Sequence, residues 1–256
     1  MALIREKITG IVGIPSQILT LSRTGGAGQV RLKSVLLSAD YVPKSVSGYI
    51  SSVWSADVYG HYGMTETGLG GGVECRARDG YHLREADLLF EIVDPASGLP
   101  VPDGEWGEIV FSTLTRRGMP LIRYRTGDRS RFLTSPCPCG AVLRRLDRVS
   151  GRLAETVSLA NGQTLTISQL DELLLSEPSV LMYRAALTRR DGCDVLSLTI
   201  RSAGAPLDPN ALTRKLYPVL GGLLRDGLLH LEITGGDVDF FTTGTLKRRI
   251  ADHRNH

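Results

Sequence analysis

Strand-like and helix-like segments alternate near the start of the chain, and this restricts the fold more than any other feature of the sequence. Residues 8–22 have the pattern of a buried strand, a turn at Pro15 and the beginning of a helix. Residues 30–37 predict a second strand and residues 45–53 a helix, after which Val58 leads into a glycine-containing loop. This order predicts an α/β fold built around a parallel sheet.

Beyond about residue 88 the sequence changes to short strands and tight turns. Residues 88–93 and 108–111 are predicted strands, and the stretch 94–104 between them is rich in Asp, Pro and Gly. The pattern predicts an antiparallel hairpin and a β-subdomain that ends at about residue 146. We therefore expect a first domain over residues 1–151, with a junction at Gly151 and Arg152.

The remaining residues, 152–256, have the pattern of a small α+β domain. Residues 168–175 predict a helix with Ser168 as its N-cap. Further predicted elements are a strand at 194–201, a helix at 209–223 and a strand at 229–234. A segment of this length is within the usual size range of a domain.

The composition is that of an ordinary globular protein and argues against several functional classes. The 256 residues are 42% hydrophobic and 22% charged, enough for a buried core in one or two domains. The 30 basic and 27 acidic residues give a net charge of +3, a balance that argues against a nucleic-acid partner. No apolar run approaches the roughly 20 residues of a membrane span, and the start does not resemble a signal peptide. We therefore expect a cytoplasmic protein with reduced cysteines.

The first motif is the glycine-rich loop at residues 59–68. Gly63 allows a close approach of the backbone to a ligand, and Thr65 offers a hydroxyl to a phosphate oxygen. Glu66 is a hard oxygen ligand suited to Mg²⁺, and Tyr62 offers a flat ring to a base. Because short glycine loops are common, a plain turn with a solvated glutamate is the alternative.

The second motif is the stretch Met-Pro-Leu-Ile-Arg-Tyr-Arg-Thr-Gly-Asp at residues 119–128. Gly127 permits a tight turn, and the Asp128 carboxylate can accept hydrogen bonds from two ribose hydroxyls, as carboxylates do in dinucleotide-binding folds. Taken alone, the stretch is also compatible with a strand end followed by a turn aspartate.

Together the two motifs resemble the adenylate-forming superfamily of acyl-CoA synthetases, and within it the phenylacetate–CoA ligase-like branch. Four stretches carry the resemblance in the family's order and spacing: residues 62–66, 103–114, 119–128 and 147–152. The resemblance implies an α/β fold in which residues 1–151 are an incomplete large domain with a β-subdomain. Residues 152–256 would then be the small α+β lid domain.

Members of this family use ATP and Mg²⁺ to convert a carboxylic acid into an acyl-adenylate, and a thiol, often coenzyme A, then displaces AMP. The physical task is to hold a carboxylate oxygen in line with the α-phosphate while cations offset the developing charge. The implied contacts of the adenylate are Ser38, Ala39, Asp40 and Tyr62 at the adenine, Gly63 and Thr65 at the phosphate, Glu66 at Mg²⁺, and Asp128 with Arg152 at the ribose. His61, Gly68 and Gly70 would border a small-molecule carboxylate substrate.

The sequence also departs from the family's pattern. The family's Ser/Thr/Gly-rich phosphate loop with its lysine is not found, and Thr245 stands where the family has a catalytic lysine. Lys247 is the candidate replacement, because residues two apart on a strand share a face. Ala154 stands at the hinge position, where the family usually has Asp or Lys.

These departures leave two functional alternatives open. One is a truncated or split ligase, completed by a homodimer or by a separate N-terminal-half chain. The other is a non-catalytic relative: a protein that binds AMP or an adenylate, or the partner subunit of a separately encoded N-terminal half. A zinc-stapled interaction module that merely retains the fold is a further alternative. The lost positive charge at Thr245 favours the second alternative, since such a charge contributes several kcal/mol to transition-state stabilisation in comparable cases.

Three cysteines and one histidine form a further constellation, with Cys75 and His82 after the first motif and Cys137 and Cys139 in a proline-rich turn. Three thiolates and an imidazole are typical of a closed, structural zinc site. Some phenylacetate–CoA ligase-like sequences resemble this arrangement. The alternative is four unrelated residues, because the spacing is less specific than paired C-x₂-C motifs. Cys193 is expected to be a lone cysteine.

Overall fold

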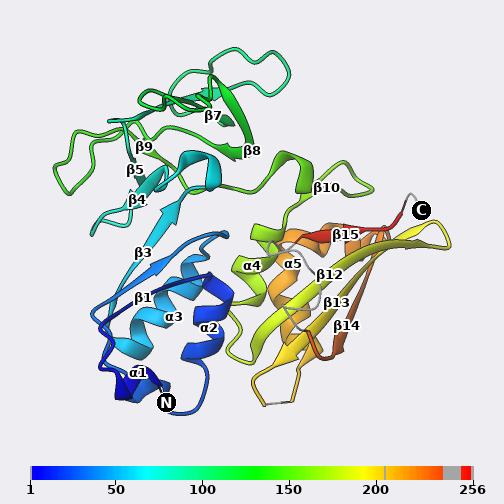
Figure 1. Cartoon of the computed structure of the whole chain (residues 1–256). Helices are drawn as coiled ribbons and strands as arrows, with labels where there is room; N and C mark the ends of the chain where they lie inside the picture. Colours follow the sequence, from blue (N-terminus) through cyan, green and yellow to red (C-terminus); the bar gives the residue numbers. More distant parts are fainter. Residues whose placement is uncertain (1, 205, 239–248, 255–256) are drawn as a thin grey trace. The chain divides into compact units, whose positions relative to one another are not determined.

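The computed structural model describes residues 2–204, 206–238 and 249–254. Its contacts divide the chain into two compact units (Figure 1). Unit 1 comprises Met1–Pro15, Gly28–Val42 and Ile50–Ala154, and unit 2 comprises Ser16–Ala27, Pro43–Tyr49 and Glu155–His256. Unit 1 therefore contains both sequence motifs and the predicted metal ligands.

A six-stranded mixed sheet is the framework of unit 1, in the order β1-β2-β3-β4-β5-β9. The parallel part consists of β1 (Gly10–Gly13), β2 (Ser34–Leu37) and β3 (Asp57–Tyr62). The antiparallel part consists of β4 (Gly72–Glu74), β5 (Tyr81–Leu83) and β9 (Arg145–Leu146). The predicted α/β fold with a parallel sheet is thus confirmed.

The short helix α1 (Ala2–Arg5) precedes β1, and α2 (Pro15–Ser22), the 3₁₀ turn η1 (Ala27–Gln29) and α3 (Lys44–Trp54) connect the parallel strands. The prediction placed a turn at Pro15, but α2 begins at this residue. Proline is suited to the first helical position because its φ is already helical and its missing N–H would have no partner there. The second strand is shorter than predicted and starts at Ser34.

A three-stranded antiparallel sheet follows, formed by β6 (Leu88–Val93), β7 (Gly107–Thr113) and β8 (Tyr124–Ser130). It confirms the predicted hairpin. Buried side chains of both sheets form one apolar cluster, to which Tyr62, Tyr81, Phe90, Phe111, Phe132 and Leu146 belong. This shared core fixes the first motif at the end of β3 relative to the second motif on β8.

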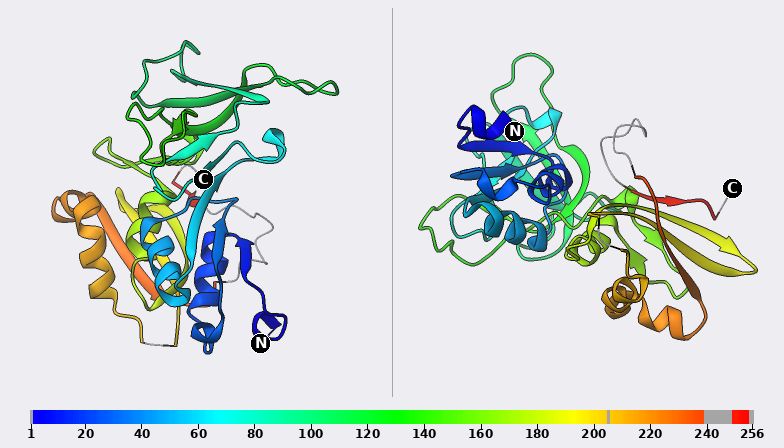
Figure 2. Two further views of the ribbon diagram at one scale, coloured as in Figure 1. Left: turned by 90° about the vertical axis from the view of Figure 1, so that its left-hand side faces the viewer. Right: turned by 90° about the horizontal axis from the view of Figure 1, so that it is seen from below.

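Unit 2 has a four-stranded sheet in the order β14-β13-β12-β15, with α4 and α5 on one face of it (Figure 2). Its elements are η3 (Leu153–Glu155) at the boundary, β10 (Val157–Ser158), β11 (Thr164–Leu165), α4 (Ile167–Leu174), β12 (Val180–Arg190), β13 (Cys193–Ser202), α5 (Pro209–Arg225), β14 (Leu229–Gly235) and β15 (Ile250–Asp252). The predicted N-cap of α4 was wrong. Thr166 caps this helix by accepting a hydrogen bond from the Gln169 backbone N–H, whereas Ser168 lies inside it and is buried.

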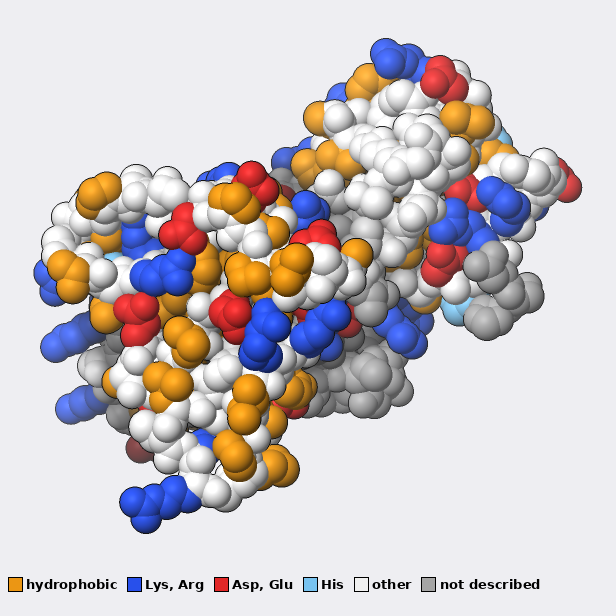
Figure 3. Space-filling view, turned by 90° about the horizontal axis from the view of Figure 1, so that it is seen from above, with side chains coloured by type: hydrophobic (Ala, Val, Ile, Leu, Met, Phe, Trp, Pro, Cys, Tyr) orange, Lys and Arg blue, Asp and Glu red, His pale blue; other side chains and the backbone are white. Residues whose placement is uncertain are grey.

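On the face shown in Figure 3, basic and acidic side chains are interspersed among hydrophobic ones, in keeping with the balanced composition. Among the described residues, no helix has both the length and the hydrophobicity that a transmembrane segment needs.

Candidate functional site

The segment Ser38-Ala39-Asp40, expected to border an adenine, and the start of the first motif lie where two parallel strands end. Ser38 follows the last residue of β2, and His61 and Tyr62 end β3. The Ser38 hydroxyl is hydrogen-bonded to Nδ1 of His61 at 2.8 Å. Ligands of α/β proteins bind beyond the carboxyl ends of parallel strands, so this edge is the expected place for a nucleotide.

The segment Ser38-Ala39-Asp40 is held in a defined conformation. Ala39 has a φ of 71°, in the left-handed region that costs a residue with a side chain free energy. Asp40 accepts a 2.8 Å hydrogen bond from the backbone N–H of Tyr41. Backbone strain of this kind is found at ligand sites, where the surrounding structure maintains it.

Tyr62, Asp128 and Arg152 form a connected group. The Tyr62 hydroxyl donates to Oδ2 of Asp128 at 3.1 Å, and Nε of Arg152 lies 3.3 Å from Oδ1. Burial, and then the Asp128 charge, raise the pKa of the Tyr62 hydroxyl well above its usual value, so it stays a donor. Asp128 and Arg152, the two residues expected at the ribose, are thereby brought together, and Tyr62 orients the Asp128 carboxylate.

The expected stacking of Tyr62 on an adenine meets a largely buried side chain in the structure. Tyr62 is only 7% exposed, and its ring lies 6.2 Å from that of Tyr81. The sequence could not reveal this burial, because Tyr81 and Asp128 are distant along the chain. The geometry instead gives Tyr62 the position of a residue that orients Asp128.

Glu66 and Thr65 lie in the 3₁₀ turn η2 (Thr65–Thr67). Thr65 is exposed, and half-buried Glu66 accepts a 3.2 Å hydrogen bond from the Tyr124 hydroxyl. This contact joins the two motifs, since Tyr124 begins β8. Tyr124 had no expected role, although it lies within the second motif.

The expected reason for Gly63, close approach to a ligand, differs from what the structure shows. A Cβ at Gly63 would lie 2.9 Å from Cα of Gly70 and 2.9 Å from the His61 ring. Gly63 therefore makes room for the chain's own loop.

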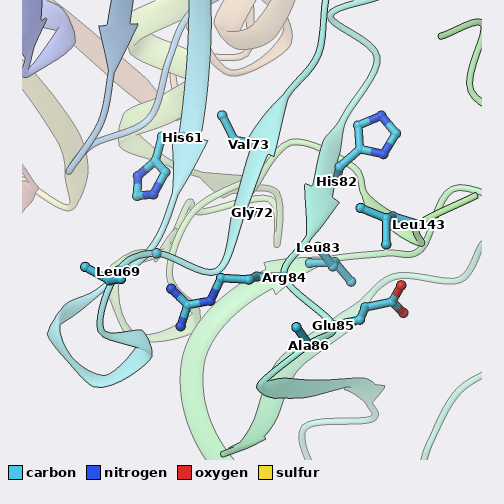
Figure 4. Close-up of a pocket in the computed structure, with 11 residues that line it drawn as sticks. His61, Leu69, Gly72, Val73, His82, Leu83, Arg84, Glu85, Ala86 and Leu143 are labelled. Carbon is cyan, nitrogen blue, oxygen red and sulfur yellow. The ribbon is translucent and has the colours of Figure 1, made fainter. Parts of the chain in front are cut away.

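A cavity of about 360 Å³ lies beside this loop (Figure 4). Its lining includes two of the three expected substrate residues, His61 and Gly70, but not Gly68. Leu69, Val73, Leu83 and Leu143 contribute apolar walls. Figure 4 shows His61, Leu69 and Arg84 on one side and His82, Glu85 and Leu143 on the other. Burial lowers the pKa of His61, which favours a neutral imidazole at this wall.

The four expected metal ligands converge on one point. Their ligand atoms all lie within 4.8 Å of one another, although they come from β5, the residue after β4 and the loop between β8 and β9. Sγ of Cys75 lies 3.6 Å from Sγ of Cys137, and Sγ of Cys139 lies 3.5 Å from Nε2 of His82. Tetrahedral zinc with Zn–S bonds of about 2.3 Å separates its ligand atoms by slightly less than 4 Å, so the spacing fits.

The chemical state of these groups also suits a metal. Burial lowers the pKa of His82, which favours the neutral imidazole that a metal binds. The backbone N–H of Ala141 donates to Cys139 Sγ at 3.4 Å and is the main cause of a lowered pKa of this thiol. All four cysteines, including Cys193 in unit 2, are free thiols.

Two expected catalytic features lie outside the described residues. They are Thr245, at the family's lysine position, and its candidate replacement Lys247.

Comparison with known proteins gives consistent matches. The chain is 37% identical to the phenylacetate-coenzyme A ligase of Escherichia coli (strain K12) over 203 residues, which are 76% of this chain and 45% of that protein. It is 32% identical to that of Aromatoleum evansii over 199 residues, 74% of this chain and 44% of the relative. The chain thus spans less than half the length of these relatives. No family model matches it.

Solved structures agree on the fold. The crystal structure of 2-hydroxyisobutyryl-CoA ligase in the postadenylation state, in complex with R3-HIB-AMP, superposes with a TM-score of 0.80 at 23% identity, covering 99% of this chain and 56% of that one. A benzoate CoA ligase from Burkholderia xenovorans LB400 superposes with a TM-score of 0.66 at 16% identity, covering 96% and 51%. The architecture is that of part of an adenylate-forming CoA ligase.

Proposed function

The chain belongs to the phenylacetate–CoA ligase branch of the adenylate-forming proteins, and from this premise we propose that it binds an acyl-adenylate in the ATP-dependent conversion of a small carboxylic acid into its coenzyme A thioester. The observation that carries the proposal is the Asp128 carboxylate on β8, held between Arg152 and Tyr62, the last residue of β3. A carboxylate fixed on both oxygens can present its remaining lone pairs to a ribose diol.

Each part of the adenylate has a candidate contact. Asp128 and Arg152 would hold the ribose, Ser38, Ala39 and Asp40 would border the adenine, and Thr65 would donate to the phosphate. Glu66 is the proposed Mg²⁺ ligand, and the metal would supply positive charge against the phosphate oxygens. The cavity beside His61 and Gly70 is the proposed place of the acyl group, because apolar walls suit an aryl or alkyl body.

The test is a titration with AMP and ATP, with pyrophosphate exchange measured on the same sample. We expect Asp128→Asn to weaken AMP binding by about tenfold or more, because hydrogen bonds to a charged acceptor contribute more than those to a neutral one. The matched control is Asp57→Asn, at an exposed aspartate that pairs with Arg78. Equal AMP affinity in both variants would contradict the proposed ribose contact.

A second function, adenylate binding without catalysis, is favoured by Thr245 at the family's lysine position. It predicts AMP affinity without pyrophosphate exchange. Lys247→Met separates the two functions: exchange that is present and lost in this variant supports catalysis with Lys247 as the substitute cation. Pyrophosphate exchange at the wild-type rate in Lys247→Met contradicts the role of Lys247 as the substitute cation.

We further propose that Cys75, His82, Cys137 and Cys139 hold a structural Zn²⁺ that joins the loop after β4 to the loop before β9. Zinc needs no redox change and accepts sulfur and nitrogen ligands in the geometry that these atoms approach. Thiolate ligands require reduced cysteines, which supports the proposal of a reducing compartment such as the cytoplasm. Metal analysis of the purified chain should find about one zinc per molecule.

One face of the parallel strands is a candidate for covering by another chain. Val12, Leu36 and Tyr59 are in register across β1, β2 and β3, and Val12 is 68% exposed. Leu69 and Val73 are 95% and 44% exposed. Because parallel sheets occur almost only with both faces covered, we propose a homodimer or a separate N-terminal-half chain here. Light scattering that finds a monomer whose mass is unchanged by Val12→Asp would contradict the homodimer.

A further inference from the structure

Arg145 occupies an unusual position for an arginine, because it is buried beside the metal cluster. It is the first residue of β9, and its backbone is paired with that of His82 on β5. Residues directly opposite each other in a sheet project their side chains to the same face. Only 2% of the Arg145 side chain is exposed, and a buried guanidinium is stable only when its donors have partners.

The guanidinium of Arg145 donates to both loops that carry the ligands. Nη1 donates to the backbone carbonyl of Asp79 at 2.5 Å and to its Oδ2 at 2.7 Å. Nη2 donates to the backbone carbonyl of Ser135 and lies 3.4 Å from the Ser135 hydroxyl. Asp79 lies between the ligands Cys75 and His82, and Ser135 lies two residues before Cys137.

The two loops have few regular backbone contacts of their own. The Arg78 N–H donates to the Cys75 carbonyl, and the Gly140 N–H donates to the Cys137 carbonyl, so each loop closes a local turn. Neither turn ties one loop to the other. A planar guanidinium with its donors in a fixed fork can hold two such loops at a set separation, which a single ammonium group cannot do.

We propose that Arg145 is the positioning residue of the metal cluster: it crosslinks the Cys75–His82 loop to the Cys137–Cys139 loop and thereby holds the four ligands at metal-binding distance. The inference rests on the proposed zinc site. Three thiolates and a neutral imidazole around Zn²⁺ carry one net negative charge, which the adjacent guanidinium also offsets. Groups that orient metal ligands in this way typically change metal affinity by about tenfold to a hundredfold.

The experiment measures Zn²⁺ affinity of the full chain by competition with a chromophoric chelator, and records the visible spectrum of the Co²⁺-substituted protein. Arg145→Met should weaken Zn²⁺ binding by about tenfold or more and alter the intense bands of tetrahedral Co²⁺–thiolate coordination. Arg145→Lys keeps the positive charge but lacks the planar guanidinium with its paired N–H donors. We therefore expect it to restore little of the Zn²⁺ affinity. The matched control is Arg144→Met, whose guanidinium pairs with Asp103 and covers the Phe132 ring.

Asp79→Ala serves as a second variant should Arg145→Met fail to fold. The Asp79 side chain is 51% exposed, and its loss removes the Oδ2 acceptor of Arg145 Nη1 while the backbone carbonyl acceptor stays in place. We expect this variant to weaken Zn²⁺ binding in the same direction but to a smaller extent.

The outcomes separate the two proposals. A wild-type chain that binds neither Zn²⁺ nor Co²⁺ overturns the zinc site and the role of Arg145 with it. A wild-type chain that binds metal, with unchanged affinity and Co²⁺ spectrum in a folded Arg145→Met or Asp79→Ala variant, overturns only the role of Arg145. Full rescue by Arg145→Lys would show that charge, and not the crosslink, is what matters.

Discussion

The carboxylate of Glu74 and the guanidinium of Arg148 form a largely buried ion pair at 3.0 Å, with 3% and 15% of their side chains exposed. Glu74 also accepts a 2.6 Å hydrogen bond from the Gly60 N–H on β3, and Arg148 donates to the Val42 carbonyl at 2.9 Å. Because Val42 closely follows Ser38-Ala39-Asp40, this pair connects the segment proposed to border the adenine to the strand that leads into Cys75.

Removing Arg148 should therefore destabilise unit 1 strongly. Arg148→Met leaves the Glu74 charge buried without its cation, a change that typically costs about 3–5 kcal/mol. The exposed pair of Arg78 and Asp57 is the matched case, and Arg78→Met should cost less than about 1 kcal/mol. Urea unfolding of both variants measures the difference, and equal costs would contradict the importance of burial.

Two hydroxyl deletions should separate the ribose contact from the metal contact. Tyr62→Phe removes the donor to Asp128 and should weaken AMP binding by a few-fold while the ring stays packed. Tyr124→Phe removes the donor to Glu66, the proposed Mg²⁺ ligand. In this variant, added Mg²⁺ should increase ATP affinity less than it does in the wild type. Calorimetric titrations with AMP and ATP, with and without Mg²⁺, distinguish the two variants. The same affinity changes in both variants would speak against separate roles for Tyr62 and Tyr124.

Metal removal should lower thermal stability, because a metal that binds only the folded chain stabilises it. A strong chelator is expected to decrease the Tm by several degrees, and Cys139→Ser should have a similar effect without chelator. Cys193→Ser, at a cysteine in unit 2, is the control that removes a thiol outside the cluster. A wild-type melting curve that the chelator leaves unchanged would count against the zinc site.

Stability should depend on pH through His61. Burial lowers its pKa below the ordinary 6.5, so the unfolded chain binds the proton more readily than the folded one. The corresponding stability is fully present above pH 6.5 and is lost as the pH falls below this value towards the lowered pKa. His61→Gln should lessen, but not abolish, the fall in the free energy of unfolding between about pH 7.5 and 5.5, because burial also lowers the pKa of His82. His230→Gln, at an exposed position of β14, should leave the wild-type dependence in place.

The strain at Ala39 predicts a stabilising substitution. Glycine adopts a φ of 71° without steric cost, so Ala39→Gly should raise the free energy of unfolding by up to about 1 kcal/mol. Ala86→Gly, at an exposed alanine without such a φ, should instead be neutral or destabilising. A loss of stability in Ala39→Gly would show that the strain is not stored at this residue.

The sequence predicted those features whose signals are local. The strands around residues 10–13 and 34–37 and the β6–β7 hairpin follow from short apolar patterns and turn residues, whereas the strand β3 at 57–62 was not predicted beyond Val58 leading into a loop. The sequence also predicted the metal cluster, because residue types that bind metals are rare enough to be noticed. Its members are Cys75, His82, Cys137 and Cys139. The N-cap of α4 was misplaced because Thr166 and Ser168 carry the same hydroxyl chemistry, and only the backbone geometry distinguishes them.

Other features depend on contacts between distant segments and leave no local pattern. The burial of Tyr62 depends on Tyr81 and Asp128, and the connection of Glu66 to Tyr124 crosses from one motif to the other. Arg145 looks like one of several arginines in the sequence, and only the pairing of β5 with β9 places it beside His82.

The cavity beside the first motif owes its shape to the absence of a Cβ atom at Gly70. A Cβ on Gly70 would lie 2.0 Å from Nε2 of His61, and the φ of Gly70 is 110°. Any larger residue would have to displace the imidazole and break its bond to Ser38. Exchange of this one glycine would therefore change both the cavity wall at His61 and the position of the Ser38 side chain. If the proposed adenylate site is correct, the acyl contacts and the adenine contacts are coupled through this glycine.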